Sequence, residues 1–254
     1  MNDTNSPARP VRALIFDLDG TLADTIGGIR DGMNETMNKY GYPPKTYEDI
    51  RRAIGNGARM LVKRCMPEPD ASDDAKVKRV LASYDLAYLR TYLHTRECYE
   101  GMAQTVKELH ARGYRLAVLS NKQDAYTKGQ LAQLFPDGEF EIVMGQTDLP
   151  TKPDPTVPHL IAHLLCVDPD ECAMIGDSDV DILTARNAGM MSVGCSWGYR
   201  EKAVLQSLGA HHVIDKPAQL LDIFPVVPVP CFDDEEPEDE TQEGPIDLTE
   251  EVTV

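Results

Sequence analysis

The chain lacks the features that anchor a protein in a membrane or cross-link it through thiols. Its six cysteines include no Cys-x-x-Cys pair, and several lie in apolar stretches. Cysteine packs there as a small hydrophobe, so we expect structural thiols rather than a metal or redox site. No apolar run reaches the roughly 18 residues that a membrane-spanning helix needs. The first residues also lack the basic flank and apolar segment of a signal peptide, and we expect a cytosolic protein without membrane contact.

Basic residues are scarce as well. The 25 Lys and Arg residues stand against 42 Asp and Glu residues, which gives a formal net charge of −17. Eleven of the acidic residues lie between 233 and 251, where there is no Lys or Arg, and without these eleven the net charge is −6. Nucleic-acid binding normally requires clustered Lys and Arg, so the composition argues against a nucleic-acid partner.

The end of the chain differs in composition from the rest. Residues 225–230 contain prolines too densely for a helix or a central strand, and an acidic block follows them. Such a block buries too little apolar surface to offset the entropy of ordering the chain. We therefore expect a Pro-rich linker and a disordered acidic tail over residues 225–254.

The rest of the sequence alternates between short apolar runs and segments with helical spacing. Runs that are apolar on both faces are typical of buried parallel strands, and intervening helices indicate a doubly wound sheet. The expected strands are 11–16, 115–119, 140–144, 172–175, 191–195 and 212–214, and the helices between them are 102–112, 125–134, 155–165 and 180–188. This pattern predicts an α/β fold with a Rossmann-like core.

One long stretch interrupts this alternation. Residues 25–97 contain no convincing strand, and three segments in them, 26–40, 58–65 and 75–91, have helical periodicity. In an open α/β sheet, the loops that leave the carboxyl ends of the strands border the ligand crevice. We therefore expect residues 25–97 to form a small helical cap, inserted into a core built from residues 11–24 and 98–224.

The first expected strand runs directly into two carboxylates, in Phe16-Asp17-Leu18-Asp19-Gly20-Thr21. Side chains alternate along a strand, so Asp17 and Asp19 should point the same way. An Asp-Gly turn would also end a strand. Two like charges this close repel each other, however, and a fold tolerates that cost where a cation or a reaction uses it. The segment favours a Mg²⁺-dependent phosphoryl-transfer site.

Polar residues also follow three other expected strands. They are Ser120 and Asn121 after the second strand, Lys152 after the third, and Asp177 and Asp181 after the fourth. Each of them alone could be a helix cap or a turn residue. In a doubly wound sheet these strand ends lie along one edge, so we expect the side chains to converge. A phosphate dianion would be repelled by the carboxylates unless a metal cation and Lys152 reversed the local charge.

This order of motifs resembles the haloacid dehalogenase-like hydrolase superfamily, and the match covers residues 11 to about 224. The first family motif, a hydrophobic residue followed by Asp-x-Asp-Gly-Thr, appears at residues 16–21. The other three motifs are a Ser or Thr that ends a strand, a Lys, and Gly-Asp-x-x-x-Asp, and they appear as Ser120, Lys152 and residues 176–181. All four stand in the family's order.

The resemblance implies a role for each of these residues. Asp17 would be the nucleophile that forms an aspartyl-phosphate, and Asp19 would protonate the leaving oxygen and later take a proton from water. Mg²⁺ would be bound by the Asp17 carboxylate, the Asp19 backbone carbonyl and Asp177. Asp181 would orient a metal-bound water or Lys152. The phosphate would be held by Ser120, Asn121 and Lys152.

Two further segments look like those of the phosphoglycolate phosphatase branch. They are residues 54–58, Ile-Gly-Asn-Gly-Ala, and residues 196–200, Ser-Trp-Gly-Tyr-Arg. Glycines ahead of a helix can present backbone amides to a substrate carboxylate, although an ordinary helix start explains them equally well. The resemblance implies phosphoglycolate as the favoured small-molecule substrate, and Asn56, Gly57 and Arg59 as candidates for substrate specificity.

Other functions remain open at this point. A phosphosugar mutase would use the same Asp17 and Asp19 but would return the phosphoryl group to an intermediate instead of to water. Other relatives in this branch act on pyrophosphate. A dehalogenase is disfavoured because a halide leaving group needs no acid, whereas Asp19 supplies one. A non-catalytic regulatory protein is disfavoured by the intact set of Asp17, Asp19, Lys152 and Asp177.

Overall fold

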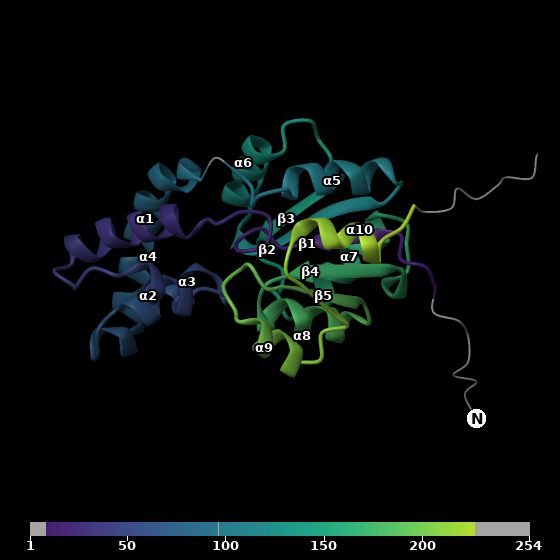
Figure 1. Ribbon diagram of the computed structural model, residues 1–254. Helices are drawn as coiled ribbons and strands as arrows, with labels where there is room; N and C mark the ends of the chain where they lie inside the picture. The colour runs from purple at the N-terminus through teal and green to yellow at the C-terminus, as the bar shows by residue number, and fades with distance from the viewer. Residues whose placement is uncertain (1–8, 96, 227–254) are drawn as a thin grey trace, which may run out of the picture.

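The computed structural model of the protein describes residues 9–95 and 97–226. Its six strands form one sheet in the order β3-β2-β1-β4-β5-β6, and every pairing is parallel (Figure 1). The strands are β1 (Ala13–Phe16), β2 (Arg115–Gln123), β3 (Ile142–Gln146), β4 (Cys172–Gly176), β5 (Met191–Cys195) and β6 (His212–Ile214). The prediction of a doubly wound parallel sheet is confirmed. The expected acidic tail lies outside the described residues from 227 onward.

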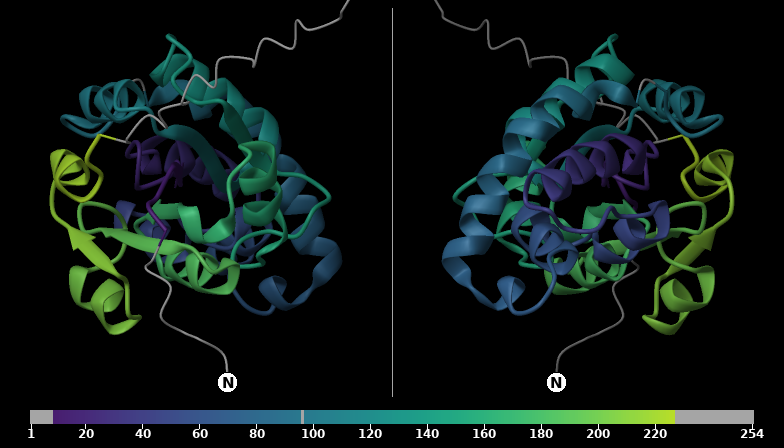
Figure 2. Two further views of the ribbon diagram at one scale, coloured as in Figure 1. Left: turned by 90° about the vertical axis from the view of Figure 1, so that its right-hand side faces the viewer. Right: turned by 90° about the vertical axis from the view of Figure 1, so that its left-hand side faces the viewer.

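Helices cover both faces of the sheet (Figure 2). Along β1 the side chains alternate, so Leu14 and Phe16 belong to a core that includes α5 (Met102–Ala111), whereas Ala13 and Ile15 pack in a second core with α7 (Thr156–Leu164) and α8 (Asp179–Ala188). The other α-helices of residues 97–226 are α6 (Asp124–Leu134), α9 (Lys202–Ser207) and α10 (Leu220–Ile223). All of β1 is buried, which explains why its sequence is apolar on both faces.

Four helices lie between β1 and α5, beyond the carboxyl ends of the strands (Figure 1). They are α1 (Ile26–Lys39), α2 (Tyr47–Ala53), α3 (Gly57–Cys65) and α4 (Asp74–Thr91), and we call residues 26–91 the cap. The cap has its own apolar core, which includes Met33, Ile50 and Val62. Helices α1 and α4 approach closely at Gly28, where a Cβ atom would lie 2.4 Å from the Thr91 carbonyl oxygen.

The structure differs from the sequence expectations mainly at element ends and in short helices. β2 continues to Gln123, so Ser120 and Asn121 lie within the strand rather than after it. The register between β2 and β3 shifts between Leu119 and Gln123. Helices α2, α9 and α10 were not anticipated, because each is short and has little periodicity to detect. Within the described residues, no helix has both the length and the apolar character needed to cross a membrane.

Candidate active site

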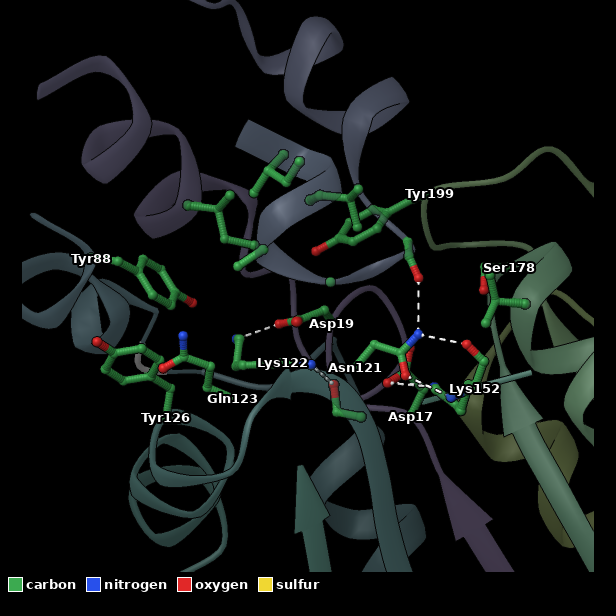
Figure 3. A pocket seen from close by; sticks show the side chains of 18 of the residues that line it. Asp17, Asp19, Tyr88, Asn121, Lys122, Gln123, Tyr126, Lys152, Ser178 and Tyr199 are labelled. Atoms are coloured by element: carbon green, nitrogen blue, oxygen red, sulfur yellow. Dashed lines mark hydrogen bonds and ion pairs between the residues drawn. The ribbon is translucent and has the colours of Figure 1, made fainter. Parts of the chain in front are cut away.

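A cavity lies between the carboxyl edge of the sheet and the cap (Figure 3). The sheet side of its wall carries most of the polar residues singled out above, and the cap side carries apolar and aromatic side chains. From the sheet side it is lined by Asp17, Asp19, Ser120, Asn121, Lys122, Lys152 and Asp177, and from the cap by Ile29, Ile54, Gly57, Leu61, Tyr84 and Tyr88, among others. The four expected motifs therefore meet in one place.

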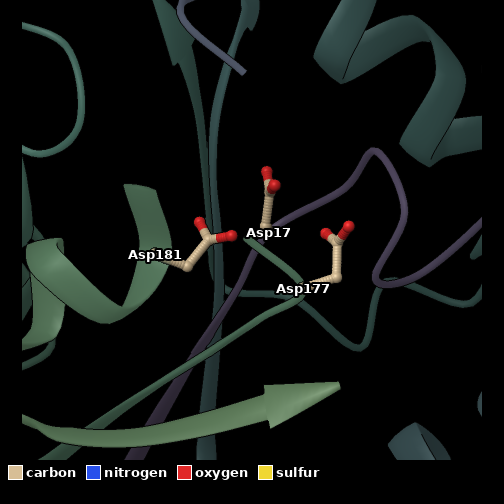
Figure 4. Close-up of side chains that lie close together, drawn as sticks. All are labelled: Asp17, Asp177 and Asp181. Atoms are coloured by element: carbon tan, nitrogen blue, oxygen red, sulfur yellow. The ribbon is translucent and has the colours of Figure 1, made fainter. Parts of the chain in front are cut away.

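Three buried aspartates lie close together (Figure 4), and two of them, Asp17 and Asp177, line the cavity. Asp17, Asp177 and Asp181 each offer a carboxylate oxygen, and these oxygens lie within 4.8 Å of one another. The pairing of the strands explains this proximity, since β1 and β4 are neighbours and Phe16 is opposite Ile175. The residues that follow the two strands are consequently placed side by side.

Two glycines allow the loops to close around Asp177. A Cβ atom at Gly198 would lie 2.2 Å from the Cβ of Asp177, and one at Gly20, whose φ is +89°, would lie 2.5 Å from its Oδ2. The carboxylate is held on both sides: the Tyr199 backbone N–H donates to Oδ2 at 2.7 Å, and the Thr21 hydroxyl donates to Oδ1 at 2.9 Å. The glycines of the first motif and of the Trp-Gly-Tyr segment thus fix the position of this aspartate.

Lys152 is the buried cation of the cluster. Its Nζ lies 3.0 Å from Asp17 Oδ1 and 2.6 Å from Asp181 Oδ1, and the residue is only 4% exposed. Burial alone would lower the pKa of the ammonium group, but the two carboxylates outweigh that effect and raise the pKa above its usual value. Lys152 is therefore charged. Asp181 is held in turn by the Ser178 hydroxyl, which donates to its Oδ2 at 2.6 Å.

The carboxylates nevertheless outnumber the cations. Burial, together with Asp181 and Asp19, raises the pKa of Asp17 to about 7 despite the opposing charge of Lys152. Burial, together with the neighbouring charges of Asp181 and Asp17, raises the pKa of Asp177 well above its usual range. When ionised, the three clustered aspartates Asp17, Asp177 and Asp181 face the single ammonium group of Lys152, which leaves two negative charges uncompensated. A divalent cation fits that deficit, and an oxygen-only donor set suits Mg²⁺.

Asp19 sits on the cavity wall between the sheet and the cap. Its Oδ1 accepts hydrogen bonds from Lys122 Nζ and from the Thr25 hydroxyl. Lys122 also donates to Gln130 Oε1 at 2.6 Å. Lys122 was not among the expected site residues. The signal was its place in the polar run that follows the apolar residues 115–119.

Ser120 and Asn121 occupy different environments although they are adjacent. Ser120 is 3% exposed and lines the cavity. The Asn121 amide donates to the Lys152 carbonyl oxygen at 3.0 Å and to the Gly55 carbonyl oxygen at 3.2 Å, and its Oδ1 accepts from the Lys152 N–H at 2.9 Å. Both donors of this amide are engaged. Asn121 thus positions Lys152 and ties the cap loop to the sheet, which differs from the expected direct contact with phosphate.

Of the three specificity candidates, the structure brings only Gly57 to the cavity. The Asn56 Oδ1 accepts from Arg64 Nη2 at 2.6 Å, and Arg59 pairs with Asp74 at 2.8 Å on the exposed surface of the cap. The physical reason is the start of α3 at Gly57: Asn56 is its exposed N-cap residue, and Arg59 lies on its exposed side rather than on the side of the buried Leu61. Tyr84 and Tyr88 were not expected at the site, because tyrosines on the apolar face of a helix cannot be told from core residues by sequence.

Known proteins resemble this chain in architecture and in sequence. A sequence model of the family described as haloacid dehalogenase-like hydrolase matches residues 14–195. The phosphoglycolate phosphatase of Rhodospirillum rubrum is 35% identical over 83% of this chain and 90% of its own, and that of Vibrio vulnificus strain CMCP6 is 31% identical over 84% and 96%. A crystal structure of a predicted phosphoglycolate phosphatase from Haemophilus somnus 129PT superposes with a TM-score of 0.77 at 25% identity, covering 84% of this chain and 97% of that one.

Proposed function

The chain belongs to the haloacid dehalogenase-like hydrolase family, and on this premise we propose that it hydrolyses a small phosphate monoester, most readily phosphoglycolate, through an aspartyl-phosphate on Asp17. The observation that carries the proposal is the buried set of Asp17, Asp177, Asp181 and Lys152, three of which line the cavity. This set combines a nucleophile, a fixed cation, a carboxylate suited to a metal (Asp177) and a carboxylate that holds the cation (Asp181). It favours phosphoryl transfer over a binding role alone.

Asp17 is arranged for attack on phosphorus. Its Oδ1 accepts from the Leu18 N–H at 2.7 Å and lies 3.0 Å from Lys152 Nζ, which orients the carboxylate and leaves Oδ2 for the attack. As the bond from Oδ2 to phosphorus forms, the bond from phosphorus to the ester oxygen breaks, and the alcohol leaves with a proton. Lys152 stabilises the charge of the phosphoryl oxygens during this transfer.

Asp19 supplies the proton. The Lys122 and Thr25 contacts hold its carboxyl group on the cavity wall, beside the place where the leaving oxygen must emerge. In the second step Asp19 takes a proton from water as the water oxygen attacks phosphorus. The bond between phosphorus and Asp17 then breaks, and inorganic phosphate leaves. The buried Ser120 hydroxyl lines the same wall and can donate to a phosphoryl oxygen.

The donor set fits Mg²⁺, which the Asp17 carboxylate, the Asp19 backbone carbonyl and the Asp177 carboxylate would hold. When bound, Mg²⁺ would neutralise charge on the phosphoryl oxygens. Asp181 is committed to Lys152 and Ser178, so we assign it to the support of Lys152 rather than to the metal. The two uncompensated negative charges of the site support this proposal.

The cap supports phosphoglycolate as the substrate. Helix α3 begins at Gly57 in the cavity wall, its N-terminus has no side-chain cap, and its first turn contains no acidic residue. Its free backbone N–H groups are therefore suited to a carboxylate. The named activity of the Rhodospirillum and Vibrio relatives agrees with this chemistry.

The test is release of inorganic phosphate from phosphoglycolate, other small monoesters, hexose phosphates and pyrophosphate, with Mg²⁺ and with chelator. We expect phosphoglycolate to have the highest kcat/KM, and Asp17→Asn to abolish turnover without loss of folding. Asp137→Asn is the matched control, because Asp137 pairs with Lys107 on the surface. Isomerised sugar phosphate without phosphate release would instead indicate a mutase. Retention of a tenth of wild-type activity by Asp17→Asn would exclude Asp17 as the nucleophile.

A further inference from the structure

The hydroxyl group of Tyr88 is buried without a hydrogen-bond partner. Tyr88 belongs to α4 of the cap and is 4% exposed, and within residues 9–95 and 97–226 nothing donates to its Oη or accepts from it. A buried polar group without a partner loses its hydration and gains nothing in exchange, so native structures contain few of them. This hydroxyl therefore requires an explanation.

The position of the Tyr88 hydroxyl suggests an explanation. Tyr88 lines the same cavity as Asp17 and Asp19, and Figure 3 shows its hydroxyl turned into that cavity on the side where Lys122 and Gln123 lie. Neither neighbour makes a hydrogen bond to it: the Lys122 ammonium donates to Asp19 and Gln130, and the Gln123 amide donates to Asp85. The hydroxyl is thus available to form a hydrogen bond with a ligand bound in the cavity.

The ring that carries this hydroxyl is fixed. It stacks on Tyr84 with 5.4 Å between ring centroids and meets the Tyr126 ring edge-on at 5.1 Å. The Lys122 ammonium lies 5.7 Å from its centroid. These contacts prevent the ring from turning its hydroxyl toward another acceptor of the protein. The hydroxyl is held ready for a ligand at no further entropic cost.

We propose that the Tyr88 hydroxyl donates a hydrogen bond to an oxygen of the leaving group, and thereby selects phosphate esters whose alcohol carries an oxygen acceptor. This inference rests on the proposed hydrolase function and adds the feature of the substrate that the cap recognises. For phosphoglycolate the acceptor is the carboxylate. An ester without such an oxygen leaves the hydroxyl unpaired, and sites built around a buried polar group reject such analogues strongly.

The experiment compares phosphoglycolate with ethyl phosphate, which lacks the second oxygen group, on the wild-type protein, Tyr88→Phe and Tyr114→Phe with Mg²⁺. Tyr88→Phe should lose about 10- to 100-fold in kcat/KM for phosphoglycolate, as expected for a hydrogen bond to a charged group, and change by about twofold or less for ethyl phosphate. Its melting temperature should stay the same or rise, because the substitution removes an unpaired buried hydroxyl.

Tyr114→Phe is the matched control. Tyr114 is also 4% exposed, but it lies away from the cavity and its hydroxyl donates to the Pro225 carbonyl oxygen at 2.7 Å. Its substitution should lower the melting temperature and leave the ratio of the two kcat/KM values unchanged. A purely structural role of Tyr88 would give the same result as Tyr114.

The outcomes separate this inference from the proposed function. Equal losses on both esters, no loss on either, or a wild-type protein without preference for phosphoglycolate would overturn the role of Tyr88 while leaving the hydrolase intact. Phosphate release that survives Asp17→Asn, or no release at all, would overturn the proposed function. Calorimetric titration of phosphoglycolate into Asp17→Asn, with and without Tyr88→Phe, tests the hydroxyl independently of turnover. An unchanged Kd there would also overturn its role.

Discussion

Replacement of Asn121 by alanine should disturb the active site through Lys152. The Asn121 amide group makes three hydrogen bonds, one to Gly55 and two to the backbone of Lys152, and the residue is 9% exposed. Asn121→Ala removes all three and leaves the Lys152 N–H and C=O groups without these partners. The variant thereby frees the segment that carries the buried ammonium group, although Lys152 itself is unchanged.

The expected loss of stability follows from those three hydrogen bonds. At about 1 kcal/mol net for each hydrogen bond, the three together contribute roughly 3 kcal/mol to the free energy of unfolding. For a protein of this size that corresponds to a fall of about 6 to 12 °C in the melting temperature. A shift of Lys152 Nζ by about 1 Å away from Asp17 should lower kcat by roughly 100-fold.

Asn187→Ala provides the control on the other side of the same segment. Asn187 is exposed and its amide donates to the Pro153 carbonyl oxygen at 2.9 Å, so its loss should cost at most about 1 kcal/mol and leave kcat within about twofold. Chemical denaturation and phosphate release at saturating substrate measure both quantities. If Asn121→Ala lost no more stability and activity than Asn187→Ala, the positioning role of Asn121 would be refuted.

Three other predictions concern the aspartates. Asp19→Asn should impair turnover most for esters with poor leaving groups and least for p-nitrophenyl phosphate, so an equal loss across a leaving-group series would contradict its role as acid. Gly198→Ala places a Cβ atom 2.2 Å from that of Asp177 and should raise the Mg²⁺ concentration needed for half-maximal activity, whereas Gly27→Ala, where a Cβ meets nothing, should not. The pKa of Asp17 is about 7 in the folded protein against an ordinary 3.8, so the folded state binds this proton more tightly. The contribution of this proton to the free energy of unfolding is fully present below about pH 4 and is lost by about pH 7. In the presence of chelator the melting temperature should therefore fall between about pH 4 and pH 7. A melting temperature that does not change over this range would contradict the raised pKa of Asp17.

The sheet could be predicted from the sequence because its strands are buried on both faces. Residues 13–16 and 172–176 are apolar or small throughout, and only parallel strands covered by helices require that pattern. The end of β2 could not be predicted in the same way. Ser120, Asn121 and Lys122 are polar, and they lie between Leu119 and Gln123, where the register with β3 shifts.

The meeting of Asp17, Lys152 and Asp177 was also predictable, since topology alone brings the carboxyl ends of parallel strands to one edge. The hydrogen bonds that each side chain makes could not be predicted from the sequence. Whether Asn121 faces a ligand or a neighbouring backbone depends on the position of Gly55 in the cap. Likewise, Arg59 and Gly57 are two residues apart, but the start of α3 places one outside the cavity and the other in its wall.

The order of the strands also has a consequence for biosynthesis. β1 is made first and takes a central place, where Ala13 pairs with both Arg115 and Cys172. Contacts between residues this far apart in the chain form slowly, because a long loop must close before they stabilise anything. A growing chain must therefore hold the apolar β1 unpaired while the ribosome completes the whole cap and β2, and one edge of β1 stays open until β4 is made. Chaperone dependence during synthesis should accordingly fall sharply once residues beyond β4 emerge.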